Sequence, residues 1–234
     1  MNAAPPLLEQ AVRYALAVTR DIPHAQLSRP TPCREWDLAM LLAHANESLA
    51  ALAEGAVAGH VAPPAPDELA PDELAPDELA PSELAPSELA LSERESGHRE
   101  PDGPTSPCHG RADGHSALVG PPRDLLATFR QRARRLPSLW TVTPRVVGVA
   151  DRAMPADLMA AAGALEIAVH AWDIARSCRR DLPIPAAVAV ELFSVGAVLV
   201  PANDRHPFFA PQAKVAVTAC PSDRLVAFLG RDPG

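Results

Sequence analysis

A five-residue repeat in the middle of the chain sets the strongest limit on how this sequence can fold. From Asp67 to Leu91 the chain reads Asp-Glu-Leu-Ala-Pro three times, then Ser-Glu-Leu-Ala-Pro and Ser-Glu-Leu-Ala-Leu. Prolines at five-residue spacing remove backbone donors and clash with the preceding turn, so no continuous helix can form there. The repeat is also acidic and lacks aromatic residues. We predict a disordered or partly extended linker within a low-complexity insert at about 59–120, with a partner-binding motif as the alternative.

The rest of the chain has the composition of a single helical domain spanning 1–234. Hydrophobic residues make up 47% of the chain but aromatic residues only 4%. Alanine, leucine and valine must therefore supply the core, which favours closely packed helices over a sheet sandwich. Apolar spacing predicts helices over 7–19, from 37 to about 55–59, and over 124–139, 155–178, 185–200 and 221–229. We expect an extended segment over 140–151, a loop over 203–211 and a short strand over 214–218.

The charge and the cysteine content bear on partners and location. A formal net charge of -8 argues against nucleic acid or an anionic membrane as a partner. The sequence shows neither a signal peptide nor an apolar stretch long enough to span a membrane, the best candidate being 186–200, so we expect a cytoplasmic protein. The cysteines have no paired short spacing and are expected to be reduced thiols: Cys33, Cys108, Cys178 and Cys220.

The predicted helix over 155–178 carries a narrow polar stripe between apolar residues. With Glu166 at zero on a helical wheel, His170 lies at about 40°, Asp173 at about 340° and Ser177 at about 20°. Leucine, isoleucine and valine side chains flank this stripe on both sides. If they pack, Glu166 is at least partly buried, and a buried carboxylate requires a cation or hydrogen-bond donors. A metal ion or an arginine would satisfy it, and Glu166 and His170 one turn apart can chelate one ion.

A third metal ligand must come from another helix, and His44 is the best candidate. It lies at the border of the apolar stripe of its own predicted helix, so it can point into a groove of the bundle. Three protein ligands leave a position open for water or substrate, which is typical of catalytic sites. Asp173 can orient His170 or hold a water. The alternatives are an arginine partner for Glu166, a hydrogen-bonded core histidine at His170 and a half-exposed groove residue at His44.

Three stretches together resemble one protein family. They are Thr31-Pro32-Cys33-Arg34-Glu35-Trp36-Asp37 followed by Leu41-Leu42-Ala43-His44, then Glu166-Ile167-Ala168-Val169-His170-Ala171-Trp172-Asp173-Ile174-Ala175, and the ending from Asp223 to Pro233. In this order and spacing they resemble actinobacterial metal-binding proteins related to the N-terminal domain of mycothiol-dependent maleylpyruvate isomerase, in the DinB-like superfamily. The resemblance implies an all-α, up-down-down-up four-helix bundle with a metal at one end, here followed by a short C-terminal extension.

The resemblance also implies the ligands and the chemistry. The metal ligands would be His44, Glu166 and His170, and the metal is typically zinc in the isomerase branch, although mixed histidine and carboxylate ligands also suit Ni²⁺ and Fe²⁺. This chain departs from the family in its long insert between the second and third helices. It also has Asn46-Glu47-Ser48 where small glycines often follow the histidine.

Our leading hypothesis is a metal-dependent transferase or isomerase that uses mycothiol or another low-molecular-weight thiol on a small electrophile. The alternative is a non-catalytic metal-binding or stress-associated bundle. The partners would be the thiol and the electrophile, and the assembly is left open between a monomer and a homodimer. Secondary candidates have ordinary structural explanations as well. They are Cys33 as a nucleophile, the arginines Arg176, Arg179 and Arg180 as anion ligands, and a second metal tract formed by His98, Cys108, His109 and His115.

Overall fold

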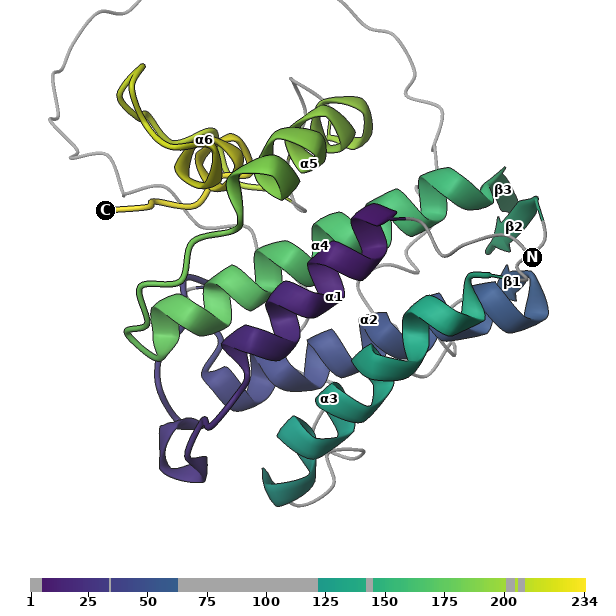
Figure 1. The fold of residues 1–234 in the computed structure, drawn as a ribbon, viewed down its shortest axis with the longest axis horizontal. Helices are drawn as coiled ribbons and strands as arrows, with labels where there is room; N and C mark the ends of the chain where they lie inside the picture. Colours follow the sequence, from purple (N-terminus) through teal and green to yellow (C-terminus); the bar gives the residue numbers. More distant parts are fainter. Residues whose placement is uncertain (1–5, 34, 63–121, 142–144, 201–204, 206–208) are drawn as a thin grey trace, which may run out of the picture.

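Four long helices make up the body of the computed structural model, which describes residues 6–33, 35–62, 122–141, 145–200, 205 and 209–234 (Figure 1). The helices are α1 (Pro6–Val18), α2 (Leu38–Ala58), α3 (Pro122–Leu139) and α4 (Ala156–Ser177). They confirm the predicted helices to within a few residues. The pentapeptide repeat, most of the predicted insert and the residues of the second metal tract lie outside the described residues.

The directions of the helices follow from how their ends meet. Strand β1 (His60–Val61) follows α2 and pairs in parallel with β2 (Val146–Val149), which follows α3. Helices α2 and α3 therefore end at the same end of the bundle, and α4, which begins after β3 (Arg152–Pro155), starts there and runs back. Helix α1 runs alongside α4, since Arg180 after α4 donates to the carbonyl of Val18 at the end of α1 (3.0 Å). The bundle is thus up-down-down-up, as the resemblance implied.

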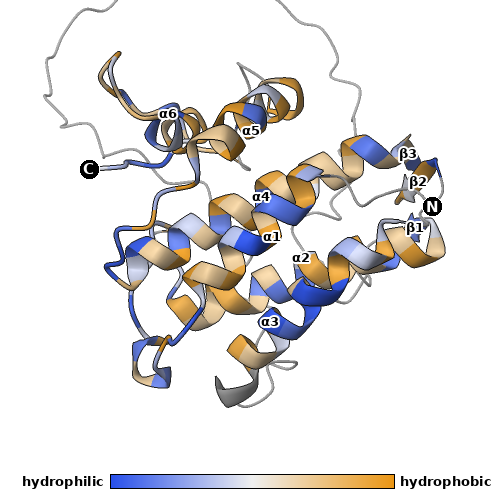
Figure 2. Cartoon of the chain, viewed as in Figure 1, coloured by the Kyte–Doolittle hydropathy of each residue, from blue (hydrophilic) through white to orange (hydrophobic). Residues whose placement is uncertain are grey.

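The bundle core is formed by the apolar faces of the four helices. Helix α1 packs on α3 and α4, and α2 packs on the same two helices. Helix α3 buries one apolar face, formed by Leu125, Leu126, Phe129, Ala133 and Leu136. In Figure 2, hydrophilic residues are frequent along α3, whereas α5 (Ala186–Leu199) is mainly hydrophobic. Burial of these stripes supplies most of the driving force for the bundle.

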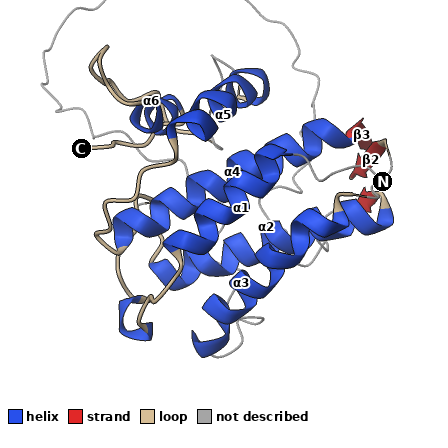
Figure 3. Cartoon of the chain, in the orientation of Figure 1, coloured by secondary structure: helices blue, strands red, loops and turns tan. Residues whose placement is uncertain are grey.

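The small sheet was only partly predicted (Figure 3). Trp140 belongs to a turn after α3, and in the described part of the predicted extended segment, 140–141 and 145–151, the strand is β2. Strand β2 forms an unpredicted hairpin with β3. The prediction of a strand over 214–218 was wrong, because this segment is irregular and pairs with no strand among the described residues. Short strands depend on partners elsewhere in the chain, which local residue preferences do not identify.

The beginning of the predicted insert also needs correction. Asp37 caps α2 by accepting from the backbone N–H of Met40 (2.9 Å), as expected, and Gly59 ends the helix in the left-handed conformation (φ 68°). His60 and Val61 then pair with β2. Residues 59–62, which we assigned to the insert, therefore belong to the folded domain.

A short C-terminal extension packs against one side of the bundle, as predicted. It contains α5, which contacts α1 and α4, and α6 (Pro221–Phe228), which contacts α5. The apolar stretch over 186–200 was not the best membrane-span candidate, since α4 is the helix long and apolar enough by length and composition to cross a bilayer. Most of α4 is buried inside the protein, as is usual for a core helix.

Candidate metal centre

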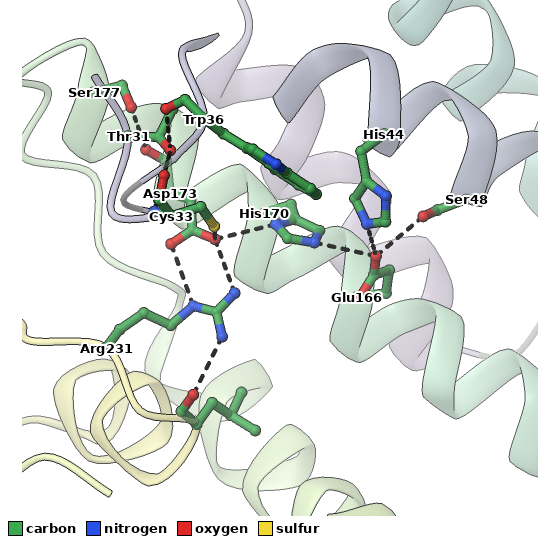
Figure 4. A network of polar contacts seen from close by, with 11 residues as sticks. Thr31, Cys33, Trp36, His44, Ser48, Glu166, His170, Asp173, Ser177 and Arg231 are labelled. Carbon is green, nitrogen blue, oxygen red and sulfur yellow. Dashed lines mark hydrogen bonds and ion pairs between the residues drawn. The ribbon is translucent and has the colours of Figure 1, made fainter. Parts of the chain in front are cut away.

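The three side chains proposed as metal ligands meet between α2 and α4 (Figure 4). Glu166 Oε1 lies 3.0 Å from Nε2 of His44 and 3.1 Å from Nε2 of His170. One donor atom from each residue lies within 4.8 Å of the others, and the two imidazole rings meet edge-on with centroids 5.1 Å apart. The tertiary structure thus brings His44, which is 122 residues away in sequence, to the Glu166–His170 pair.

The spacing of these donors suits a small divalent cation. Tetrahedral Zn²⁺ with bonds of about 2.0–2.1 Å places neighbouring ligand atoms roughly 3.3 Å apart. The two measured separations to Glu166 are within a few tenths of an ångström of that value. The His44 and Glu166 side chains are 33% and 38% exposed, whereas His170 is only 10% exposed. The cluster is therefore closed around His170 and accessible at His44 and Glu166, so a bound cation could accept a further ligand.

Asp173 fixes the orientation of His170. Its Oδ2 accepts from Nδ1 of His170 (3.1 Å), which leaves Nε2 directed at Glu166 and at the proposed cation position. A carboxylate behind a metal-binding histidine selects the tautomer and raises the basicity of the ligand atom. Asp173 is completely buried and lies one turn after His170 on the predicted stripe. Of the two roles that the sequence left open for Asp173, this hydrogen bond fits the orientation of His170, which stays a prediction.

Arg231 is a site residue that the sequence analysis missed. Its Nη2 donates to Asp173 Oδ2 (3.1 Å) and its Nε to Asp173 Oδ1 (3.4 Å), a bidentate contact from the segment after α6. We had considered an arginine as the partner of Glu166, and the structure instead places one on Asp173. Arg231 lies in the third stretch of the resemblance, but nothing in its spacing along the chain indicated this contact.

Two further residues support the cluster from α2 and the loop before it. Ser48 lies one turn after His44 and donates from its hydroxyl to Glu166 Oε1 (3.0 Å). The buried ring of Trp36 packs on His44 with centroids 5.0 Å apart. The four-residue spacing of His44 and Ser48 could have predicted that both lie on one face of α2. The position of Trp36 could not be predicted in this way, because it depends on the conformation of the loop before α2.

The departure from the family pattern after His44 has a structural explanation. Asn46 is buried, and its amide donates to the carbonyls of Leu42 (2.8 Å) and Leu125 (3.1 Å), which ties α2 to α3. Arg132 donates to the Asn46 carbonyl (2.6 Å) and adds a second tie between the two helices. The Asn46-Glu47-Ser48 segment thus joins α2 to α3 through Asn46 and contacts the candidate metal ligand Glu166 through Ser48.

The protonation states follow from burial and neighbouring charges. Burial alone would raise the pKa of Glu166, but the His170 and His44 imidazoles outweigh it and hold this pKa well below the usual range. Burial would lower the pKa of His170, but the carboxylates of Glu166 and Asp173 raise it well above the ordinary histidine value. Burial would raise the pKa of Asp173, yet Arg231 and His170 keep it lowered. Both acids are therefore carboxylates at neutral pH.

A second group of donors, Cys33, His170 and Asp173, is a poorer metal site. The Cys33 thiol lies 3.9 Å from Asp173 Oδ2, and all three residues are buried. However, both oxygens of Asp173 already accept from the Arg231 guanidinium, whose positive charge opposes a second cation. Complete burial of Cys33 also favours a small residue packed in the core over a nucleophile. The described cysteines Cys33, Cys178 and Cys220 are thiols, as expected.

Zn²⁺ affinity is expected to rise with pH through the neutral range by roughly tenfold per pH unit. The raised pKa of His170 means that this imidazole carries a proton in the absence of a cation, and a metal at Nε2 must displace it. Glu166 contributes no proton because its pKa is lowered. Calorimetric titrations with Zn²⁺ in buffers of different ionisation enthalpy will measure the protons released. A pH-independent affinity would contradict ligation by His170.

Fold and site together define a helical-bundle protein with a candidate metal centre of two histidines and a glutamate. The family model described as the mycothiol maleylpyruvate isomerase N-terminal domain matches residues 8–175, which include all three candidate ligands and most of the bundle. The chain belongs to this family. No curated protein and no solved structure shows significant similarity to the chain.

Proposed function

We propose that this protein binds one divalent cation, with Zn²⁺ as the best fit, through His44, Glu166 and His170. The observation that carries the proposal is the convergence of three donor atoms, two of them 3.0 and 3.1 Å from Glu166 Oε1, on the accessible side of a buried polar network. A cation at this point would replace the two imidazole protons that now satisfy Glu166. Ni²⁺ and Fe²⁺ suit the same donors.

We further propose that the centre serves a thiol-dependent transferase or isomerase, with mycothiol as the thiol named in the family description. Zn²⁺ with an open position supplies a place for a thiol to bind and stabilises its thiolate at neutral pH. The chain's own residues prepare that position: Asp173 sets the tautomer of His170, Ser48 orients Glu166, and Trp36 holds the ring of His44. The electrophile is a small molecule able to enter from the exposed side of the cluster.

The test is turnover of mycothiol, supplied with either 1-chloro-2,4-dinitrobenzene or maleylpyruvate, by the zinc-loaded full chain. We expect S-arylation with release of chloride, or isomerisation, above the uncatalysed rate in the parent protein. Glu166→Ala should reduce the rate to that of the chelator-treated protein. Glu191→Ala, which removes an exposed glutamate of α5, should leave it unchanged.

The metal content of each variant separates the two parts of the proposal. A parent protein that holds Zn²⁺ but turns over neither substrate pair with any of several thiols would overturn the enzymatic part and favour the non-catalytic metal-binding alternative. A parent that binds no Zn²⁺ would overturn both. The cytoplasmic location, the lack of nucleic-acid and membrane partners, and the choice between monomer and homodimer remain predictions from the sequence.

A further inference from the structure

A cleft lined by three arginines lies at the end of α4, away from the candidate metal centre. Its volume is about 360 Å³, and Arg29, Arg176 and Arg179 line it together with Thr31, Ser177 and two prolines of the loop before α2. Ser177 follows His170 by seven residues, which is about 10 Å along the helix axis. The cleft is therefore a separate feature from the metal ligands, and it is large enough for a small molecule.

The arginines of this cleft have no acidic partner in the described part of the chain. The ion pairs there involve Glu166 and Asp173, and none includes Arg29, Arg176 or Arg179. The whole chain carries a formal net charge of -8, so three unpaired cations in one concave place are unusual for it. Gathering like charges is unfavourable unless an anion or the carbonyl end of a helix offsets them.

Two of the arginine side chains are held by contacts, and the third is positioned by its backbone. Arg29 donates from Nη1 to the carbonyl of Ser177 (3.3 Å), and Arg176 lies over the Trp172 ring at 5.5 Å. Arg179 adopts a left-handed backbone conformation (φ 53°), which is uncommon for this residue type, and its N–H donates to the Arg176 carbonyl. The guanidinium groups of Arg29 and Arg176, which these contacts hold, lose less freedom when a ligand binds.

The other polar groups at this end of α4 are occupied within the protein. The hydroxyl of Thr31 contacts the carbonyls of Cys33 and Trp36 and accepts from the Cys33 N–H, and the Ser177 hydroxyl donates to the Asp173 carbonyl (Figure 4). Arg180, which we had grouped with the cleft arginines, instead donates to the carbonyls of Val18, Arg20 and Asp21 at the end of α1. Donors for a ligand therefore come from the guanidinium groups of Arg29, Arg176 and Arg179.

We propose that this cleft binds the anionic group of a small molecule, either a carboxylate or a phosphate, through the three guanidinium groups. A carboxylate presents two oxygens side by side, and a phosphate presents several such pairs. Either pair can accept two parallel hydrogen bonds from one guanidinium group. The proposal goes beyond the metal-dependent function and does not depend on it, because none of the cleft residues is a proposed metal ligand. It assigns an anion site to the end of α4.

The experiment is an NMR titration of the full chain with inorganic phosphate and, separately, with succinate, at constant ionic strength and in the presence of a chelator. We expect saturable shifts centred on Arg29, Thr31 and Arg179. The double variant Arg176→Gln/Arg179→Gln should weaken binding by about tenfold or more, since each removes hydrogen bonds to a charged group. Arg134→Gln, which removes an exposed arginine of α3, is the matched control and should leave the affinity unchanged.

A charge-conserving variant separates a built site from general attraction. Arg176→Lys/Arg179→Lys keeps both positive charges but loses the guanidinium forks, so we expect it to bind several-fold more weakly than the parent. Saturation by only one of the two anions would support the proposal and identify the class of anionic group. Absence of saturable binding by both, or equal binding by the parent and the glutamine double variant in a folded state, would overturn it.

Discussion

Replacement of His170 by alanine is expected to leave the protein almost free of metal, with Zn²⁺ affinity reduced by more than a hundredfold. Loss of a group that only hydrogen-bonds to a ligand already costs about 10–100-fold in metal affinity, and His170 is proposed as a ligand itself. Among the described residues, the His170 ring also links Asp173 to Glu166 through its two nitrogens. The variant therefore disconnects the Asp173–Arg231 pair from Glu166. Plasma mass spectrometry of untagged protein and competition with a chromophoric chelator will measure the effect.

Controls for this result come from other histidines and from the other ligands. His24→Ala removes an exposed histidine outside the cluster and should bind Zn²⁺ as the parent does. His44→Ala and Glu166→Ala should lose the metal as His170→Ala does. Retention of about one equivalent in all three ligand variants would refute the proposed centre. It would also direct attention to the tract of His98, Cys108, His109 and His115, which lies outside the described residues.

Substitution of Asp173 by alanine is expected to lower the free energy of unfolding by about 3–5 kcal/mol, the usual cost of removing one partner of a buried ion pair. Asp173 is completely buried and accepts from both Arg231 and His170. Without the carboxylate, the largely buried Arg231 guanidinium, 11% exposed, loses its counter-charge. Urea denaturation in the presence of a chelator measures this loss apart from any stabilisation by bound metal.

Two further variants give the prediction its controls. Asp157→Ala, in the first turn of the same helix, removes an exposed carboxylate and should cost at most about 1 kcal/mol. The double variant Asp173→Leu/Arg231→Met replaces both charges by apolar groups and should recover part of the stability that Asp173→Ala loses. If Asp173→Ala proved no more costly than Asp157→Ala, the buried pair with Arg231 would not form in solution.

The helices and the polar stripe on α4 could be predicted because both depend on short-range regularity. Glu166, His170, Asp173 and Ser177 share a face through the 3.6-residue period of the helix alone, whatever surrounds it. The apolar residues beside the stripe indicated burial, and the structure confirms it for His170, Asp173 and Ser177. His44 was a candidate because it lies at the border of the apolar stripe of its own helix, and the family resemblance supported the choice; no local pattern measures how close it comes to Glu166. The assignment of the whole chain to one domain stays a prediction.

The network around the site depends on contacts between distant parts of the chain. Arg231 reaches Asp173 across 58 residues because α5 and α6 fold back along the bundle and carry the last segment to α4. Pairing of β1 with β2 brings together segments on either side of the insert, and it decides where the insert begins. Arg180 lies next to Arg179 in sequence, yet it donates to the carbonyls at the end of α1 whereas Arg179 lines the cleft.

The sequence by itself determined which segments are helices and which residues of α4 lie on one polar face, because a helix repeats every 3.6 residues independently of its neighbours. The tertiary structure decided the rest: the arginine that neutralises Asp173, the serine and tryptophan that hold Glu166 and His44, and the place where three guanidinium groups converge. These contacts depend on how the helices pack and on where the loops place distant segments. Contacts between residues far apart in the chain leave no periodic pattern in a single sequence.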